Sequence, residues 1–245
     1  MKVAVCLSGI CRGDISKNLE IMKEHFPYDY YFATWKNSEI HESIKDEVFY
    51  IDEPDMHYHP ILDVEKMKHP KLQNIKKEML SFGTPLSGKK YKERILHHTK
   101  QIIIHNELLK LIPDDYDMII RIRYDTRLSK KVDFSKYLKM SYDKKLSIGF
   151  GTRTSRYKNF NDLYEIPKIY IRHDTPDSVS RDWSYYLMDP MIFHPRSMFK
   201  DRLVKRLHKQ KKLLPAEYGW YQILSEPYGD NHLSVYGGAQ IEKYL

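Results

Sequence analysis

Residues 118–124 form the segment that most constrains the fold, because Met118, Ile119 and Ile120 are all apolar and charged residues follow only at its end. A strand that opens with an unbroken apolar run is typical of the buried centre of a parallel sheet. A second apolar segment, residues 2–8, opens the chain and stops at the turn-prone pair Ser8-Gly9. Between them come segments with helical periodicity. This alternation predicts an α/β fold with a mostly parallel central sheet flanked by helices.

The rest of the chain completes this pattern. Further strands are expected at residues 28–35, 47–51, 146–150, 185–193 and 232–236. Helices are expected at residues 17–25, 71–80, 91–112, 196–212 and 217–224, the first of them capped by Asp14 or Ser16. Because no internal repeat, low-complexity tract or linker interrupts the order, we expect residues 1–245 to form one domain.

Composition excludes several classes of protein. A hydrophobic fraction of 41% supports a packed core, which excludes a disordered chain. No apolar run approaches the ~20 residues of a membrane-spanning helix, so no transmembrane segment is expected. The start of the chain is typical of a buried strand rather than of a secretory signal. With Cys6 and Cys11 as the only cysteines, neither a disulfide framework nor a structural zinc site is supported. These features predict a cytoplasmic protein.

The formal net charge of +8 favours anionic partners such as a phosphorylated small molecule, nucleic acid or a membrane face. Residues 205–212 supply much of it. They are typical of the solvated face of a helix, and the alternative is a patch for an acceptor or for peripheral contact with a membrane. No zinc finger, recognition helix or RNA-binding aromatic motif accompanies the charge, so nucleic acid is not expected as a partner.

Polar residues follow the first strand directly. Ser8 and Gly9 end that strand, and Arg12 comes three residues after Gly9. A glycine lets the backbone approach a ligand closely, and an arginine can hold a phosphate with two hydrogen bonds. Ligands of open α/β sheets bind beyond the carboxyl ends of the strands, so this is a candidate phosphate site. The alternative is an ordinary surface turn with an exposed arginine.

A second polar cluster ends the strand at residues 118–124. Arg121 and Arg123 alternate along the strand and should lie on one face, with the apolar residues on the other. A buried arginine needs an anionic partner. Asp125 stands where the strand ends, placed to meet a sugar hydroxyl or a divalent cation, Mg²⁺ or Mn²⁺. The alternative is an internal salt-bridge cluster in which Asp125 pairs with Arg121 or Arg127.

The third cluster is carboxylate. Asp189 interrupts an apolar stretch and should be semi-buried. An isolated carboxylate in such a place tends to have a raised pKa, which suits a general base. Alternatively, Asp189 accepts hydrogen bonds from turn amides ahead of Pro190. Glu217 is a second candidate catalytic carboxylate, although its place after Pro215 also suits a helix N-terminus.

Taken together, residues 3–13, 28–35 and 116–125 resemble small GT-A-type glycosyltransferases, above all WavE-like polysaccharide-synthesis proteins of bacteria, phages and large viruses. The resemblance implies a single GT-A-like, Rossmann-like domain and transfer of a sugar from a nucleotide-diphosphate donor to a glycan or other hydroxyl acceptor. Residues 1–130 would form the donor-binding half and residues 131–245 the acceptor side. It further implies that Ser8, Gly9 and Arg12 contact the nucleotide, and that Asp125 lies at the position of the family's Asp-x-Asp motif.

The chain departs from that motif at residue 123, which is arginine where the family has a carboxylate. A divalent cation would then rest on Asp125 with a ligand from elsewhere, or Arg121 and Arg123 would replace the metal as the counter-charge of the phosphates. If Asp125 is only a salt-bridge partner, the chain is instead a non-catalytic nucleotide- or glycan-binding module. A sulfotransferase-like enzyme would need a phosphate loop that this sequence lacks.

Overall fold

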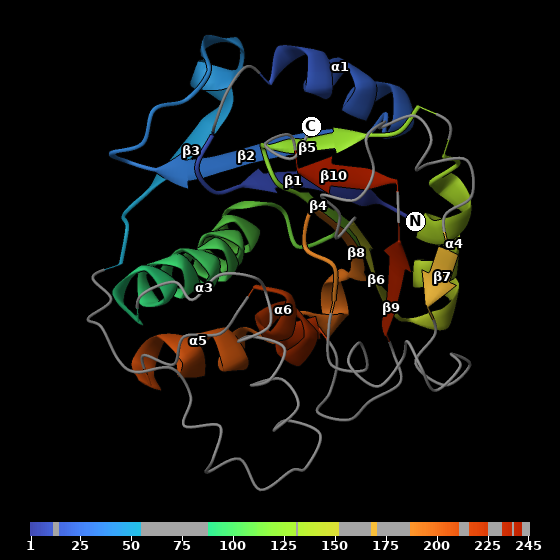
Figure 1. The fold of residues 1–245 in the computed structure, drawn as a ribbon. Helices are drawn as coiled ribbons and strands as arrows, with labels where there is room; N and C mark the ends of the chain where they lie inside the picture. Colours follow the sequence, from blue (N-terminus) through green and yellow to red (C-terminus); the bar gives the residue numbers. More distant parts are fainter. Residues whose placement is uncertain are drawn as a thin grey trace, which may run out of the picture.

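A computed structural model of the chain describes residues 1–11, 15–54, 88–130, 132–151, 168–170, 187–210, 216–224, 232–236 and 238–241. They form an eight-stranded sheet with helices on both faces and a separate two-stranded sheet (Figure 1). The larger sheet contains β1 (Val3–Ser8), β2 (Asp29–Trp35), β3 (Val48–Ile51), β4 (Met118–Ile122), β6 (Ser147–Gly151), β7 (Lys168–Tyr170), β8 (Met191–Pro195) and β9 (His232–Tyr236). The smaller sheet pairs β5 (Thr126–Leu128) with β10 (Ala239–Ile241).

The helices are α1 (Ser16–His25), α3 (Gly88–Leu111), α4 (Ser135–Lys144), α5 (Asp201–Gln210) and α6 (Ala216–Leu224), with short 3-10 helices η1 (Glu42–Glu47) and η3 (Arg196–Met198). The strand order is β3-β2-β1-β4-β8-β6-β9-β7. Four of the pairings are parallel, and β8 runs antiparallel to both of its neighbours, as β7 does to β9. The predicted α/β class, with a mostly parallel sheet flanked by helices, is confirmed.

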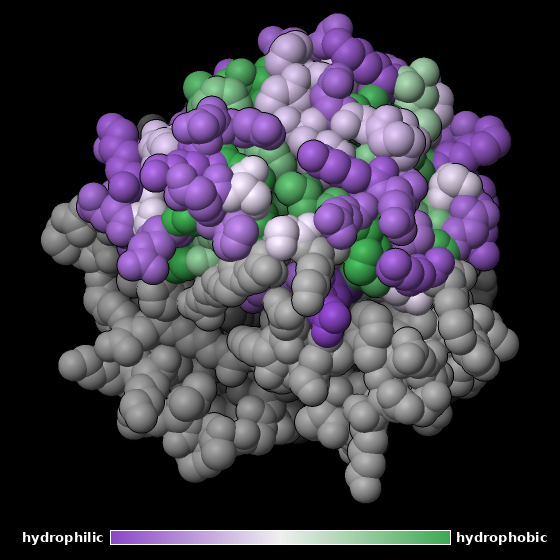
Figure 2. Space-filling view, turned by 90° about the horizontal axis from the view of Figure 1, so that it is seen from above, coloured by the Kyte–Doolittle hydropathy of each residue, from purple (hydrophilic) through white to green (hydrophobic). Residues whose placement is uncertain are grey.

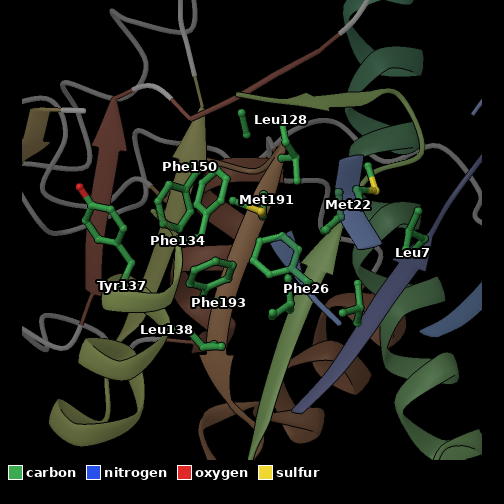
Figure 3. Close-up of a cluster of buried hydrophobic side chains, with 14 of the residues drawn as sticks. Leu7, Met22, Phe26, Leu128, Phe134, Tyr137, Leu138, Phe150, Met191 and Phe193 are labelled. Carbon is green, nitrogen blue, oxygen red and sulfur yellow. The ribbon is translucent and has the colours of Figure 1, made fainter. Parts of the chain in front are cut away.

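Alternation along the central strands divides the core between the two faces of the sheet. Val3, Val5 and Leu7 of β1 pack on the side of α1 and α4, whereas Ala4 and Cys6 pack on the side of α3 and α6. Aromatic rings fill much of the first side (Figure 3), including the contact between Phe150 and Phe193, whose ring centroids lie 4.8 Å apart. These layers fix the central strands, and therefore the positions at which they end.

Most of the elements expected from the sequence are present, with shifted ends. Of the two candidate caps of α1, Ser16 was predicted wrongly, because it is already helical and Ile15 precedes the helix without a side-chain cap; Asp14 lies outside the described residues. In place of one helix from residue 196, η3 precedes α5. Within the described part of the predicted 185–193 strand, β8 begins only at Met191. The helix expected at residues 71–80 lies outside the described residues.

Five described elements were not expected: η1, α4, β5, β7 and β10. Helix α4 buries Tyr137, Leu138 and Ser141, a spacing that places them on one side of a helix. Asp133 lies ahead of it, and its Oδ1 accepts a hydrogen bond from the Ser135 amide at 3.0 Å. Both signals are in the sequence.

The surface of the described part carries mainly hydrophilic residues on the face seen from above in Figure 2. In α5, Arg202 and Lys205 are exposed beside buried Val204, which agrees with a solvated basic face over that part of the helix. Among the described helices, none combines the length and the apolar character that crossing a membrane requires.

Candidate active site

The carboxyl ends of β1 and β4 lie side by side where the strand order reverses. From β1, the chain continues to β2 on one side, while β4 pairs with β1 on the other, with Cys6 opposite Arg121 and Leu7 opposite Ile122. Ligands of open α/β sheets bind at such a reversal, outside the carboxyl ends of the strands. The end of β4, which carries the arginines, and the end of β1, which carries Gly9, therefore lie at the same edge of the sheet.

Gly9 closes β1 in a conformation that favours glycine, with φ +129°. Its amide donates to the carbonyl of Ala33 (3.1 Å), and its own carbonyl accepts from Thr34 Oγ1 (2.9 Å). Among the described residues, no heavy atom lies within 4 Å of the place where a Cβ would stand. The backbone at Gly9 is thus fixed to β2, and the described residues leave its other side open.

Asp125 lies in a tight turn that begins as β4 ends. The amide of Thr126 donates to the carbonyl of Arg123 (3.1 Å), which brings the side chains of Arg123 and Asp125 together. Arg123 Nε lies 2.8 Å from Asp125 Oδ1, and Nη2 lies 2.8 Å from Oδ2. Of the two alternatives for Asp125, the internal ion pair is present, but its partner is Arg123 and not Arg121 or Arg127.

Arg123 also reaches the third cluster. Its Nη1 donates to Asp189 Oδ2 at 3.0 Å, so one guanidinium joins two carboxylates. Burial opposes the charge of Arg123, but Asp189 and Asp125 outweigh it and raise the pKa of Arg123 above its usual value. Asp189 was expected to be semi-buried and isolated, but it is buried and it is not isolated. The expectation of a lone carboxylate was therefore wrong, because strand β4 brings a guanidinium to it.

Arg121 is fully buried. As predicted, it lies on one face of the sheet, and the apolar neighbours Ile120 and Ile122 lie on the other. Its Nη1 donates to the carbonyl of Asp189, and Nη2 donates to Gln101 Oε1 of α3 at 3.1 Å. The guanidinium carbon lies 4.8 Å from the ring centroid of Trp220. Burial lowers the pKa of Arg121 to about 10, although the Asp189 carboxylate acts against this shift.

Residues 187–190 are held against the strand ends by the backbone of Pro190. Its carbonyl accepts from the Arg123 amide (3.1 Å) and from Thr126 Oγ1 (2.9 Å). On the other side, Gly149 of β6 lies so close that a Cβ there would be 2.7 Å from the Met188 amide nitrogen. A side chain at residue 149 would therefore displace the segment that carries Asp189.

The loop after β1 approaches the turn after β4. Tyr124 Oη donates to the carbonyl of Ala33 (3.1 Å), the same group that binds the Gly9 amide. Burial raises the pKa of the Cys11 thiol, and the negative charge of Asp125 adds to this shift. The loop after β1 and the turn after β4 thus meet, as the parallel arrangement of β1 and β4 predicts, and the antiparallel pairing of β8 with β4 brings Asp189 to the same place.

Of the candidate residues named from the sequence, the structure brings together Ser8, Gly9, Arg121, Arg123, Asp125 and Asp189. Ser8 is buried, and its hydroxyl has no hydrogen-bond partner in the described part of the chain. Arg12 lies outside the described residues. Glu217 lies in the first turn of α6, where its side chain is not described. The roles of all these residues remain predictions.

Sequence reasoning missed Gln101, Gly149 and Trp220. Each contacts the site through a residue distant in the chain, as Gln101 does through Arg121, 20 residues away. Thr126, which the sequence groups with Asp125, donates to the Pro190 carbonyl 64 residues away.

The described residues of the site do not fit a divalent cation. Both oxygens of Asp125 accept hydrogen bonds from Arg123, which places a positive charge directly against them. Mg²⁺ and Ca²⁺ need several oxygen ligands around the ion. Within the described ranges, no three His, Cys, Asp or Glu side chains lie close enough to hold a metal ion together.

Comparison with known proteins gives a likeness in structure alone. No family model matches the sequence, and no curated protein matches it. One similar structure is 4-diphosphocytidyl-2C-methyl-D-erythritol synthase from Anaerococcus prevotii DSM 20548, at 12% identity and a TM-score of 0.38 over 85% of this chain and 74% of that one. Mouse xyloside xylosyltransferase 1 is 10% identical, with a TM-score of 0.37 over 91% of this chain and 81% of that one.

An active-site mutant of the galactosyltransferase LgtC is 9% identical, with a TM-score of 0.39 over 91% of this chain and 69% of that one. The similar structures thus include a xylosyltransferase, a galactosyltransferase and a diphosphocytidyl-methylerythritol synthase. Identities of 12% or less and these TM-scores carry no conclusion about what the present chain binds or catalyses.

Proposed function

We propose that this chain is a glycosyltransferase that uses a nucleotide-diphosphate sugar and binds the diphosphate at the carboxyl edge of β1 and β4. The observation that carries the proposal is the Arg123 guanidinium, held between Asp125 and Asp189 at the end of β4, the strand next to the one that Gly9 closes. Arginine in a fixed orientation suits phosphate oxygens, and a glycine at a strand end lets a ligand approach the backbone. The position at a reversal of strand order supports a nucleotide ligand.

In this proposal, an acceptor hydroxyl attacks the anomeric carbon of the donor as the bond from that carbon to the diphosphate oxygen breaks. The departing diphosphate gains negative charge, which the guanidinium of Arg123 stabilises. Asp189 accepts the proton of the hydroxyl if the configuration inverts, and Glu217 is the second candidate for that role. The acceptor is a glycan or another hydroxyl compound.

Donor hydrolysis provides the direct test. Purified protein is incubated with a panel of UDP- and GDP-sugars, and release of the nucleoside diphosphate is measured for the wild type and for Asp125→Ala. We expect release with at least one donor and its loss in Asp125→Ala. Asp143→Ala is the matched control, because Asp143 pairs with Lys139 on the exposed surface of α4. Equal activity of Asp125→Ala and the wild type would contradict the proposal.

A non-catalytic nucleotide- or glycan-binding module is the second candidate. The observation that favours it is that Asp125 and Asp189 are both engaged by Arg123, as in a structural ion-pair cluster. A module of this kind predicts saturable binding of a nucleoside diphosphate or a glycan in calorimetry and no turnover with any donor and acceptor. Turnover that depends on Asp125 would exclude it.

A further inference from the structure

We infer that the guanidinium of Arg123 takes the place of a divalent cation in this site, so that a nucleoside diphosphate binds without metal. The inference rests on the proposed function, since it concerns the same diphosphate. It decides between the two alternatives that the sequence leaves open for the charge beside Asp125.

The Arg123 guanidinium occupies the space beside both carboxylates. Arg123 presents Nε and Nη2 to the two oxygens of Asp125, each at 2.8 Å, and Nη1 to Asp189 Oδ2 at 3.0 Å. The guanidinium therefore lies between the two carboxylates that would otherwise be available to a cation. A metal ion bound to either carboxylate, at about 2.0–2.6 Å, would lie against a positive charge that cannot be deprotonated in a protein.

The charges of the cluster also favour binding without a metal. Arg121 and Arg123 carry two positive charges against the two negative charges of Asp125 and Asp189, so the cluster is balanced without a metal. With a neutral residue at position 123, the same cluster would have an excess negative charge and would repel a diphosphate. In that case a divalent cation would be required. Arg123 removes the requirement.

Arg123 also keeps hydrogen-bond donors that the two carboxylates do not use. A guanidinium has five N–H groups, and the contacts with Asp125 and Asp189 use three of them. Two are left for phosphate oxygens. The two carboxylates also fix the orientation of the side chain, which is 14% exposed, so little reorganisation is needed when the anion binds.

Ser8 gives independent support for an anion at this edge. Its residue is 2% exposed, and its Oγ has no hydrogen-bond partner among the described residues. Leu7 pairs with Ile122, so Ser8 and Arg123 each directly follow the last pair of the β1–β4 register. A buried hydroxyl without a partner is costly, and a phosphate oxygen beside Arg123 would satisfy it.

The test measures binding rather than turnover. UDP and GDP are titrated into the full chain by calorimetry, once in EDTA and once with Mn²⁺, and Mn²⁺ alone is titrated into the protein by electron paramagnetic resonance. We expect the dissociation constant of the better nucleotide to agree within about twofold in the two conditions, because two N–H groups of Arg123 remain for phosphate oxygens without a metal. We also expect that the free protein has no Mn²⁺ site that depends on Asp125, so Mn²⁺ titrations of the wild type and of Asp125→Asn should agree.

Arg123→Ala and Arg123→Lys provide the second arm, with Lys139→Ala as a surface control. Arg123→Ala should weaken binding in EDTA by about tenfold or more, and Mn²⁺ should restore part of the affinity because Asp125 and Asp189 are then uncovered. If Arg123→Ala does not fold, Arg123→Lys must still bind more weakly than the wild type in EDTA, since an ammonium cannot bind phosphate and carboxylate in the same planar arrangement.

Two results would overturn the inference while the proposed function stands. One is nucleotide binding by the wild type only when Mn²⁺ is present. The other is Mn²⁺ binding by the free wild type that Asp125→Asn removes. If neither nucleotide binds in either condition, the proposed function fails and the inference fails with it.

Discussion

Arg123 and Asp125, two residues apart, form a two-point ion pair: Nε lies 2.8 Å from Oδ1 and Nη2 lies 2.8 Å from Oδ2. The turn hydrogen bond from the Thr126 amide to the Arg123 carbonyl makes this geometry possible. The family that the sequence resembles would have a carboxylate at residue 123. Here residue 123 is the arginine that pairs with Asp125, so the charge at that position is positive instead of negative.

Replacing Arg123 with methionine should lower the free energy of unfolding by about 3 kcal/mol, because removing one member of a buried ion cluster leaves the other charges without a partner. The side chains left behind, Asp125 and Asp189, are only 12% and 7% exposed. Urea denaturation at neutral pH measures the change. Lys139→Met, which breaks the exposed pair with Asp143, should change stability by less than about 0.5 kcal/mol. A loss no larger than that of the control would show that the cluster is not buried in solution.

The sequence was sufficient to predict β1 and β4, because an unbroken apolar run needs only local composition to be recognised. It was also sufficient to predict where their polar ends meet, since parallel neighbours end at the same edge of a sheet. Gly9 and Asp125 follow from these two facts. The partner of Asp189 does not, because Arg123 is 66 residues away in the chain and only the antiparallel pairing of β8 with β4 brings it near.

Short elements could not be predicted from the sequence for a related reason. Strands β5 and β10 have three residues each, too few for alternation to be visible. They become strands through pairing with each other, Ala239 with Leu128 and Ile241 with Thr126. That contact joins residues more than a hundred positions apart, which no local pattern records.

Gly149→Ala should destabilise the protein by about 1–3 kcal/mol, the usual cost of overpacking a dense core. The added methyl group would meet the backbone of Met188, with the amide nitrogen 2.7 Å away, and backbone cannot move aside as a flexible side chain can. Because Met188 precedes Asp189, the carboxylate should shift away from Arg123. Thermal unfolding measures the first effect, and calorimetric titration of the nucleotide bound by the wild type measures the second.

Gly151→Ala is the matched control for this prediction. A Cβ there would meet Met188 Sδ at 3.1 Å and Pro190 Cδ at 3.0 Å, longer contacts than those at Gly149, so the neighbours need to move by only a few tenths of an ångström. We expect its loss of stability to be smaller than that of Gly149→Ala. The opposite order would mean that residues 187–190 are not held as tightly against β6 as the structure shows.

Trp220→Phe should cost much less stability than Trp220→Leu. Phenylalanine keeps an aromatic face toward Arg121, whose guanidinium carbon lies 4.8 Å from the indole ring centroid, and removes an indole N–H that has no partner among the described residues. Leucine removes the aromatic face and leaves a larger cavity. We expect losses of about 1 and 3 kcal/mol, measured by urea denaturation. Equal losses would show that the ring contributes volume alone.

Stability should fall as the pH is lowered from about 6.5 toward 4, and His194 should account for part of the fall. Burial lowers the pKa of His194 to about 4, although a hydrogen bond from its ring to the Pro195 carbonyl (3.0 Å) acts in the opposite direction. His105, its neighbour at 5.8 Å between ring centroids, also has a pKa well below its usual value because of burial. Below pH 6.5 the unfolded chain binds protons that the folded chain does not.

The stabilisation is therefore complete above the unfolded pKa and is lost as the pH approaches the folded one. At about 1.4 kcal/mol for each pKa unit, His194 should contribute on the order of 3 kcal/mol to the difference between pH 7 and pH 4. Urea denaturation of the wild type and of His194→Asn over this range isolates the effect from the carboxylates, which titrate in both proteins. Asparagine keeps a donor for the Pro195 carbonyl but does not titrate, so its stability should depend less steeply on pH. Parallel pH profiles for the two proteins would show that His194 does not stay neutral and buried in the folded chain.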